Sequence, residues 1–172
     1  MKKICLFVII LFCVVHGFGQ SIKKYPIGET GCAAYFFCDP GTFNLSYSED
    51  SSKIYMGECL TGETYYGLIC VQLNQNISKI TEAEDVMLSY LDYLKTAFKV
   101  TSAAGYGKGH RLRNKENIHG IIDYWKDESG VNLKVKGWTD GNFIMVLYAK
   151  SAKELVETKA IVFLDGIIFK GM

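Results

Sequence analysis

The stretch GIIDYWKDESGVNLKVKGWTDGNFIMVLYA, residues 120–149, decides the fold because it predicts three consecutive strands joined by tight turns. The strands are expected at 120–126, 131–138 and 143–149. The two connecting stretches, 127–130 and 139–142, are rich in Asp, Ser, Asn and Gly, which favour turns. The segment is therefore expected to form an antiparallel meander.

The side-chain patterns of these strands predict different surroundings. Apolar and polar residues alternate within 131–138, so Lys134 and Lys136 are expected on a face exposed to water. Residues 143–149 are apolar on both faces, which favours a central strand with cover on each side.

Upstream of the meander the sequence predicts further strands and a long helix. Residues 53–60 and 64–73 read as a hairpin, and shorter strands are expected around the turn Asp39–Pro40–Gly41. The helix is expected over 81–99, where Thr81 and Glu84 fit a capping box. Its apolar stripe, which predicts one buried face, is Ala83, Val86, Met87, Tyr90, Leu91, Leu94, Ala97 and Phe98.

A second helix is expected after the meander, from Ser151 to Leu164, with an apolar tail that docks on the domain. Its predicted inward residues are Ala152, Leu155, Val156, Ala160 and Phe163. Asp165–Gly166 is a suitable C-terminal stop. This order of elements predicts an α+β domain, an antiparallel β-sheet flanked by two main helices.

The element order also resembles the PsbP-like family, which includes the lumenal extrinsic subunit of photosystem II and a nuclear Ran-binding factor. The resemblance spans roughly 33–168 and rests on element order and turn placement. Its features are the turn Asp39–Pro40–Gly41, the helix 81–99, the strands 121–148 with Gly137–Trp138 and Asp140–Gly141, and the ending Phe163–Leu164–Asp165. It implies an α/β/α sandwich and a role in binding other proteins, whereas the four cysteines below match no pattern of the family.

The first 19 residues are typical of an export signal. Lys2 and Lys3 precede an apolar run from Ile4 to Val15, and Gly17–Phe18–Gly19 fits a cleavage site. A helix of this run would span only about 18 Å, too short for the hydrocarbon core of a bilayer. We therefore expect residues 20–172 to form a single exported domain, periplasmic or extracellular, without a membrane span.

The predicted mature chain is nearly neutral, with 17 basic residues against 18 acidic ones once Lys2 and Lys3 are removed. Nucleic-acid binding needs an excess of Lys and Arg, so no nucleic-acid partner is expected.

Four cysteines lie in the predicted mature chain: Cys32, Cys38, Cys59 and Cys70. An even number in an oxidising compartment predicts two disulfides, for which three pairings exist. Cys32 with Cys38 would close a short loop and leave Cys59 with Cys70. A hairpin tip at Gly62–Glu63, however, places Cys59 opposite Tyr66, which keeps a pairing such as Cys32–Cys70 open. None of the spacings matches a zinc-binding pair, so no metal is expected.

A glycine-rich, basic segment follows the long helix. Gly105, Gly107 and Gly109 match neither a phosphate-binding loop nor a dinucleotide fingerprint, and no cofactor is expected. The positive cluster that follows could contact a carboxylate or phosphate of a partner.

The leading hypothesis is a non-catalytic protein-binding or assembly module whose partner is another exported or envelope protein. Its predicted partner surface comprises Lys108, His110, Arg111, Arg113, Lys115, Lys134 and Lys136. One alternative is a small hydrolase or metal-dependent enzyme using His110 or His119, the latter with Asp123. Another is a glycan-binding domain built on Tyr65, Tyr66, Tyr106, Tyr124, Trp125, Trp138 and Tyr148, although core packing also explains these aromatic residues.

Overall fold

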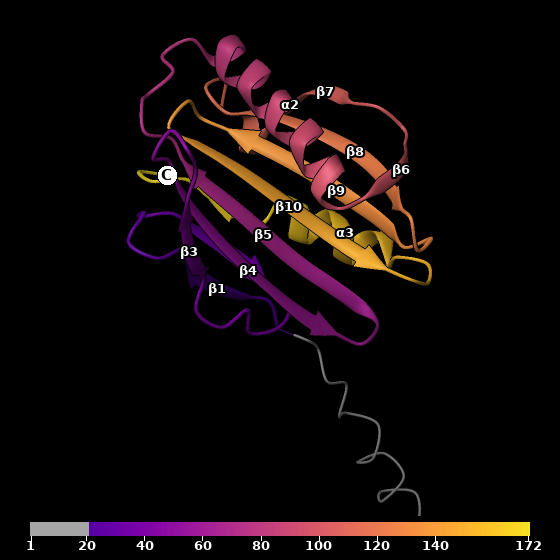
Figure 1. The fold of residues 1–172 in the computed structure, drawn as a ribbon. Helices are drawn as coiled ribbons and strands as arrows, with labels where there is room; N and C mark the ends of the chain where they lie inside the picture. The colour runs from indigo at the N-terminus through magenta and orange to yellow at the C-terminus, as the bar shows by residue number, and fades with distance from the viewer. Residues whose placement is uncertain (1–20) are drawn as a thin grey trace, which may run out of the picture.

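The computed structural model describes residues 21–172, which form two antiparallel sheets and two helices (Figure 1). The larger sheet has the order β3 (Asn44–Tyr47), β4 (Lys53–Thr61), β5 (Thr64–Gln72), β10 (Phe143–Ser151), β9 (Asn132–Thr139), β8 (His119–Asp127) and β6 (Val100–Ala103), with β7 (Gly107–Arg111) also paired to β8. The smaller sheet has the order β1 (Lys23–Pro26), β2 (Ala33–Phe36) and β11 (Ile167–Ile168). The predicted α+β class is confirmed.

Strand β10 lies at the centre of the larger sheet, as its two apolar faces predicted. It pairs with β5 on one side and with β9 on the other. Its even-numbered residues, such as Val146, pack in a core with helix α2 (Ile80–Ala97). Its odd-numbered residues, such as Met145, pack in a second core with helix α3 (Glu157–Leu164) and the smaller sheet. The two cores therefore lie on opposite faces of one strand.

Helix α2 forms where the stripe predicted it, but its start differs from the prediction. The N-cap is Lys79, which makes no side-chain cap hydrogen bond, so the predicted capping box of Thr81 and Glu84 is wrong. Glu84 instead contacts the sheet through His119. A tertiary contact has therefore taken the carboxylate that a capping box would use.

Helix α3 is shorter than predicted. Ser151 belongs to β10, and the helix begins only at Glu157. Ala160 and Phe163 are buried as expected, whereas Ala152 and Val156 are exposed, so their predicted inward position is wrong. The sheet pairing of Ser151 with Asn132 extends the strand at the expense of the helix. The apolar tail docks as predicted, because β11 pairs with β2.

The glycine-rich, basic segment between α2 and β8 contains regular secondary structure. It holds β6, β7 and a short 3₁₀ turn at Leu112–Asn114. The register of β7 against β8 shifts between Gly107 and His110, which is typical of a β-bulge.

The predicted export signal, residues 1–19, lies outside the described residues. Within 21–172, neither helix has both the length and the apolar character that crossing a bilayer requires.

Candidate binding groove

A groove lies between helix α2 and the β3–β4–β5 half of the larger sheet. Its volume is about 860 Å³, within the range typical of ligand sites. We call it the α2 groove. The floor is Ile54, Met56 and Ile69, the helix wall is Tyr90, Tyr93, Leu94, Ala97 and Phe98, and the rim is Ser46 to Asp50. Most of these side chains are apolar or aromatic, so the groove favours an apolar ligand.

The groove exists because one helix is too narrow for the sheet. Helix α2 packs on β8, β9 and β6, and it leaves β4 and β5 open on the same face (Figure 1). Adjacent strands lie about 4.8 Å apart, whereas a helix with its side chains is about 10 Å across. Only about half of the sheet face is therefore covered.

The exposed part of the predicted helix stripe lines this opening. Within the stripe, Met87 and Leu91 are fully buried, but Val86 is 41% exposed and Ala97 is also exposed. Val86 also lines a cavity of about 310 Å³ that shares Tyr90 and Tyr93 with the α2 groove. The stripe is thus wider than the face that the sheet buries, so the prediction that all of it is buried is wrong.

The rim next to the tyrosines carries two acidic residues, Glu49 and Asp50. Asp50 accepts hydrogen bonds from the Ser48 and Ser52 side chains and from the Ser52 backbone N–H. These bonds, with Ser48 contributing most, lower the pKa of Asp50. Among the ion pairs of residues 21–172, none involves Glu49 or Asp50. This rim therefore presents negative charge without an internal counterion.

Two stacked tyrosines face this rim from the helix. The ring centroids of Tyr90 and Tyr93 are 6.0 Å apart with an interplanar angle of 27°. Burial raises the pKa of Tyr90 to about 12. The pair offers flat aromatic surface beside carboxylates, a combination that suits a cationic group.

A polar network lies beside Phe98 at the other end of the groove. Phe98 packs edge-on against Tyr148 at 5.0 Å between ring centroids. The Tyr148 hydroxyl donates to Glu58 at 2.7 Å, and Lys150 pairs with the same carboxylate at 2.9 Å. Burial, followed by the bond to Glu58, raises the pKa of Tyr148. These groups satisfy one another, so the charge here is already balanced.

The predicted basic partner surface is only partly assembled. Arg111, Arg113 and Lys115 are exposed around the end of β7, and Arg113 has a left-handed backbone with φ of 49°. Lys108 is also exposed and lies 3.8 Å from Glu84. His110 is partly buried on β7, and desolvation, then Lys136, lowers its pKa. These five residues remain candidates for contact with a partner.

Lys134 and Lys136 do not belong to an exposed surface, so the predicted wet face of their strand is wrong. They are 2% and 7% exposed. Lys134 pairs with Glu157, the first residue of α3, and Lys136 pairs with Asp165 at its end, at 2.6 Å. Helix α3 covers this part of the sheet, and its two ends neutralise the two ammonium groups.

The histidines of the alternative enzyme hypothesis lie on neighbouring strands, with Arg111 opposite His119 and His110 opposite Gly120. His119 is buried, and its Nδ1 lies 2.6 Å from the Glu84 carboxylate.

Asp123 is not the partner of His119. Its carboxylate accepts from the Trp125 indole at 2.7 Å and pairs with Lys95 at 3.2 Å. The expected combination of His119 and Asp123 is therefore not formed. Among residues 21–172, no three His, Cys, Asp or Glu side chains gather as metal ligands would.

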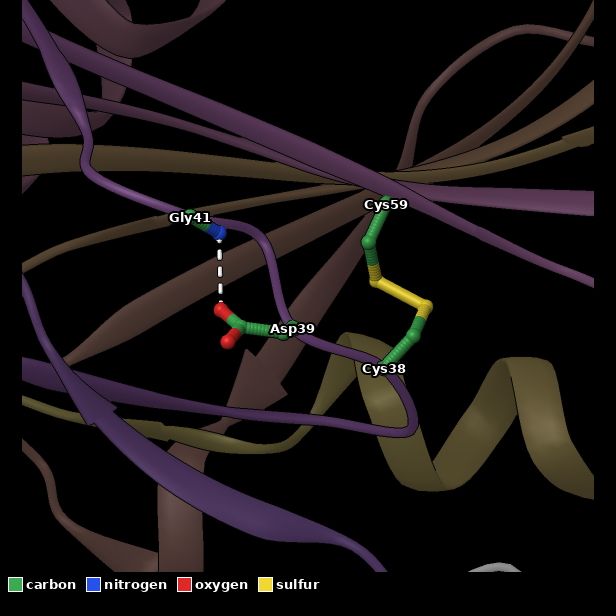
Figure 2. Close-up of a disulfide and its surroundings, with 4 residues drawn as sticks. All are labelled: Cys38, Asp39, Gly41 and Cys59. Atoms are coloured by element: carbon green, nitrogen blue, oxygen red, sulfur yellow. Dashed lines mark hydrogen bonds between the residues drawn. A yellow bond between two sulfur atoms is a disulfide. The ribbon is translucent and has the colours of Figure 1, made fainter.

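The structure contains one of the two expected disulfides, Cys38–Cys59 (Figure 2). Cys38 follows β2 of the smaller sheet and Cys59 lies on β4 of the larger one, opposite Tyr66 as predicted. Beside it the backbone N–H of Gly41 donates to Asp39 at 2.8 Å and closes the Asp–Pro–Gly turn (Figure 2). The Cys38–Cys59 disulfide ties the two sheets together.

Cys32 and Cys70 are free thiols, so the expectation of a second disulfide is not met in the structure. Both are buried in the core that contains α3. Burial raises the pKa of each thiol, which keeps it protonated and poorly reactive.

The aromatic residues of the glycan hypothesis do not gather on one surface. Tyr66, Trp125, Trp138 and Tyr148 are buried, Tyr106 is partly buried, and Tyr65 and Tyr124 are exposed on strands at different places in the sheet. The core-packing interpretation therefore accounts for most of them.

The groove residues were missed because local patterns assign them elsewhere. Tyr90, Tyr93 and Ala97 read as a helix, and Ile54 and Met56 read as a hairpin strand, but no local signal joins the two. The excess width of the helix stripe, eight residues over five turns, was the one available sign that some of it stays exposed beside the sheet.

No protein-family model matches this chain, and no curated protein matches it in sequence. The groove, the disulfide and the basic segment therefore carry the functional argument on their own.

Proposed function

We propose that this protein is an exported, non-catalytic binding module that holds an apolar segment of another exported or envelope protein in the α2 groove. The observation that carries the proposal is the apolar floor of the groove beside exposed Tyr93. Concave sites lined mainly by apolar and aromatic side chains are typical of ligand binding.

Two further features support the proposal. The disulfide Cys38–Cys59 is typical of oxidising compartments, in agreement with an export signal. The resemblance to the PsbP-like family implies protein binding, and helices on opposite faces of a sheet agree with the sandwich that it implies. The exposed residues Arg111, Arg113 and Lys115 supply a second contact surface in this proposal.

The test is binding of Nile red, a neutral apolar dye whose emission rises and shifts to the blue in apolar surroundings. We expect emission enhancement with the wild-type protein. Ala97→Trp places an indole in the α2 groove and should reduce the enhancement at least about fivefold, since the lining loses its open volume.

Val162→Trp is the matched control. Val162 is 51% exposed on α3, which packs on the opposite face of the sheet, so this variant should bind dye like the wild type. Equal dye binding by the Ala97→Trp and wild-type proteins would place the apolar site elsewhere. No dye binding by the wild type would remove the basis of the proposal.

A further inference from the structure

We infer that the α2 groove receives a basic amphipathic helix of the partner, lying alongside α2 with a Lys or Arg at the Glu49–Asp50 rim. This inference rests on the proposed function and names the chemistry of the segment that the groove binds.

The dimensions of the exposed helix face favour a helical occupant. The lining residues of α2 run from Val86 to Ala97 across the two adjoining cavities, and the C-cap residue Phe98 follows them. Twelve residues of helix rise about 18 Å, which equals slightly more than three turns. A second helix beside α2 would cover β4 and β5 at the usual spacing of 8–10 Å between helix axes.

The floor supplies what the apolar face of such a helix needs. Ile54 and Met56 are two residues apart on β4 and point to the α2 side of the sheet, and Ile69 lies opposite Met56 on β5. Met56 is 41% exposed although its neighbour Ile69 is buried. Methionine adapts its shape to an incoming apolar surface, so this floor suits side chains spaced by three and four residues.

The negative charge of the Glu49–Asp50 rim favours a positively charged segment of the partner. The charged residues that line the α2 groove are Glu49 and Asp50, and neither has an ion-pair partner within the described chain. Acidic residues such as Glu84, Asp123, Glu157 and Asp165 pair with lysine or histidine, whereas exposed Glu29 and Glu116 have no ion pair in 21–172 either. What distinguishes Glu49 and Asp50 is that their unpaired carboxylates line an apolar groove. A basic residue of the partner would therefore meet two carboxylates that have no ion-pair partner, in a groove that Tyr93 also lines.

The test uses two synthetic peptides of about 14 residues, which form about four turns. Both carry the same Leu and Ile face, one has Lys and the other Glu on its polar face, and each bears a neutral fluorophore for anisotropy. We expect the Lys peptide to bind the wild-type protein about three- to tenfold more tightly than the Glu peptide at low salt, with the difference shrinking as salt is raised.

Three variants locate the effect. Glu49→Gln/Asp50→Asn should remove the preference for Lys while both peptides still bind, because Asn keeps the Oδ1 acceptor that holds the turn. Glu29→Gln/Glu116→Gln removes the same charge at exposed positions outside the groove and should keep the preference. Ala97→Trp should abolish binding of both peptides. Circular dichroism of each variant checks that it is folded.

The outcomes separate this inference from the proposed function. Dye binding without binding of either peptide, or equal affinity for the two peptides, would overturn the basic helix and leave the apolar groove. Peptide binding that Ala97→Trp does not reduce would overturn its location. A wild-type dimer in sedimentation that Ala97→Trp converts to a monomer would make a second copy the occupant and overturn the inference.

Discussion

Lys134 and Lys136 are buried on the α3 side of the sheet although both carry a charge. Their ammonium groups lie 5.1 Å and 4.5 Å from the ring centroids of Tyr124 and Trp138, and each reaches a carboxylate at one end of α3. The aliphatic stems are buried against the strand while the charge is paired. Alternation of polar and apolar residues therefore identified the strand but not which of its faces meets water.

The pKa of His110 should depend on the pair of Lys136 and Asp165. Desolvation and the charge of Lys136 lower its pKa below the ordinary value of 6.5, while Asp165 opposes the shift. The unfolded chain then binds a proton more readily than the folded one. The contribution of His110 to stability is present above pH 6.5 and is lost as the pH falls through the lower, folded pKa.

We expect His110→Gln to lose less stability than the wild type between pH about 7.5 and about 5, because Gln does not titrate. Urea unfolding at the two pH values measures the difference. His119→Gln is not a suitable control, since it breaks the contact with Glu84. Lys115→Gln, exposed on the same segment, serves instead. An equal loss of stability in the His110→Gln and wild-type proteins would contradict the role assigned to His110.

At the scale of elements, the close packing of β8 against β9 depends on a glycine. Gly120 on β8 lies directly opposite Trp138 on β9. A Cβ at position 120 would lie 2.3 Å from Cζ3 of Trp138. The indole cannot shift freely, because its Nε1 donates to the backbone oxygen of Leu164 at 2.8 Å. The glycine therefore fixes how β8, β9 and the end of α3 pack together.

Gly120→Ala should lower the free energy of unfolding by about 2–3 kcal/mol, in the range of overpacked cores. Denaturant unfolding measures the loss. Gly107→Ala is the matched control. Gly107 lies on β7, and its added Cβ would lie 2.9 Å from the Cγ2 methyl of Ile122 on β8, a looser contact than the 2.3 Å to Trp138, so the variant should cost less. A control that loses as much stability as Gly120→Ala would show that the clash with Trp138 is not the cause.

The elements themselves were predictable to the extent that local chemistry determines them. Period-two patterns and turn residues predicted β4, β5, β8, β9 and β10, and the apolar stripe predicted α2. The start of α3 was not predictable, because the apolar residues Ala152 and Val156 match a helix stripe while Ser151 completes a strand. Sheet pairing decides that boundary, and pairing partners are distant in sequence.

At the scale of the whole molecule, the α2 groove depends on a difference in width between the larger sheet and helix α2, which no single segment reveals. A sheet of eight strands carries one long helix on one face, and the uncovered half becomes the α2 groove. The sequence indicated both components, yet their relative widths emerge only when the sheet order is known. The predicted basic surface failed in part for the same reason, since the position of α3 buries two of its lysines.

The disulfide Cys38–Cys59 is the covalent link between the two sheets, and its loss should affect the whole domain. It closes a loop with a sequence separation of 21, for which the chain-entropy model gives about 3 kcal/mol. Cys38→Ala/Cys59→Ala should therefore unfold about 3 kcal/mol more easily than the wild type under oxidising conditions. Reductant should lower the wild type to the same level and leave the variant unchanged.

Thiol alkylation checks the assignment in protein that comprises residues 20–172. The folded wild type should expose no reactive thiol, and denaturation without reductant should release two, Cys32 and Cys70. Zero thiols after denaturation would mean that these two are also joined, while four would mean that the Cys38–Cys59 bond does not form in solution. The Cys38–Cys59 disulfide anchors the segment after β2 to β4, beneath the floor strand of the α2 groove. Reduction of this disulfide should therefore also weaken dye binding. The loss should exceed that in Gly107→Ala, since Gly107 lies outside the groove.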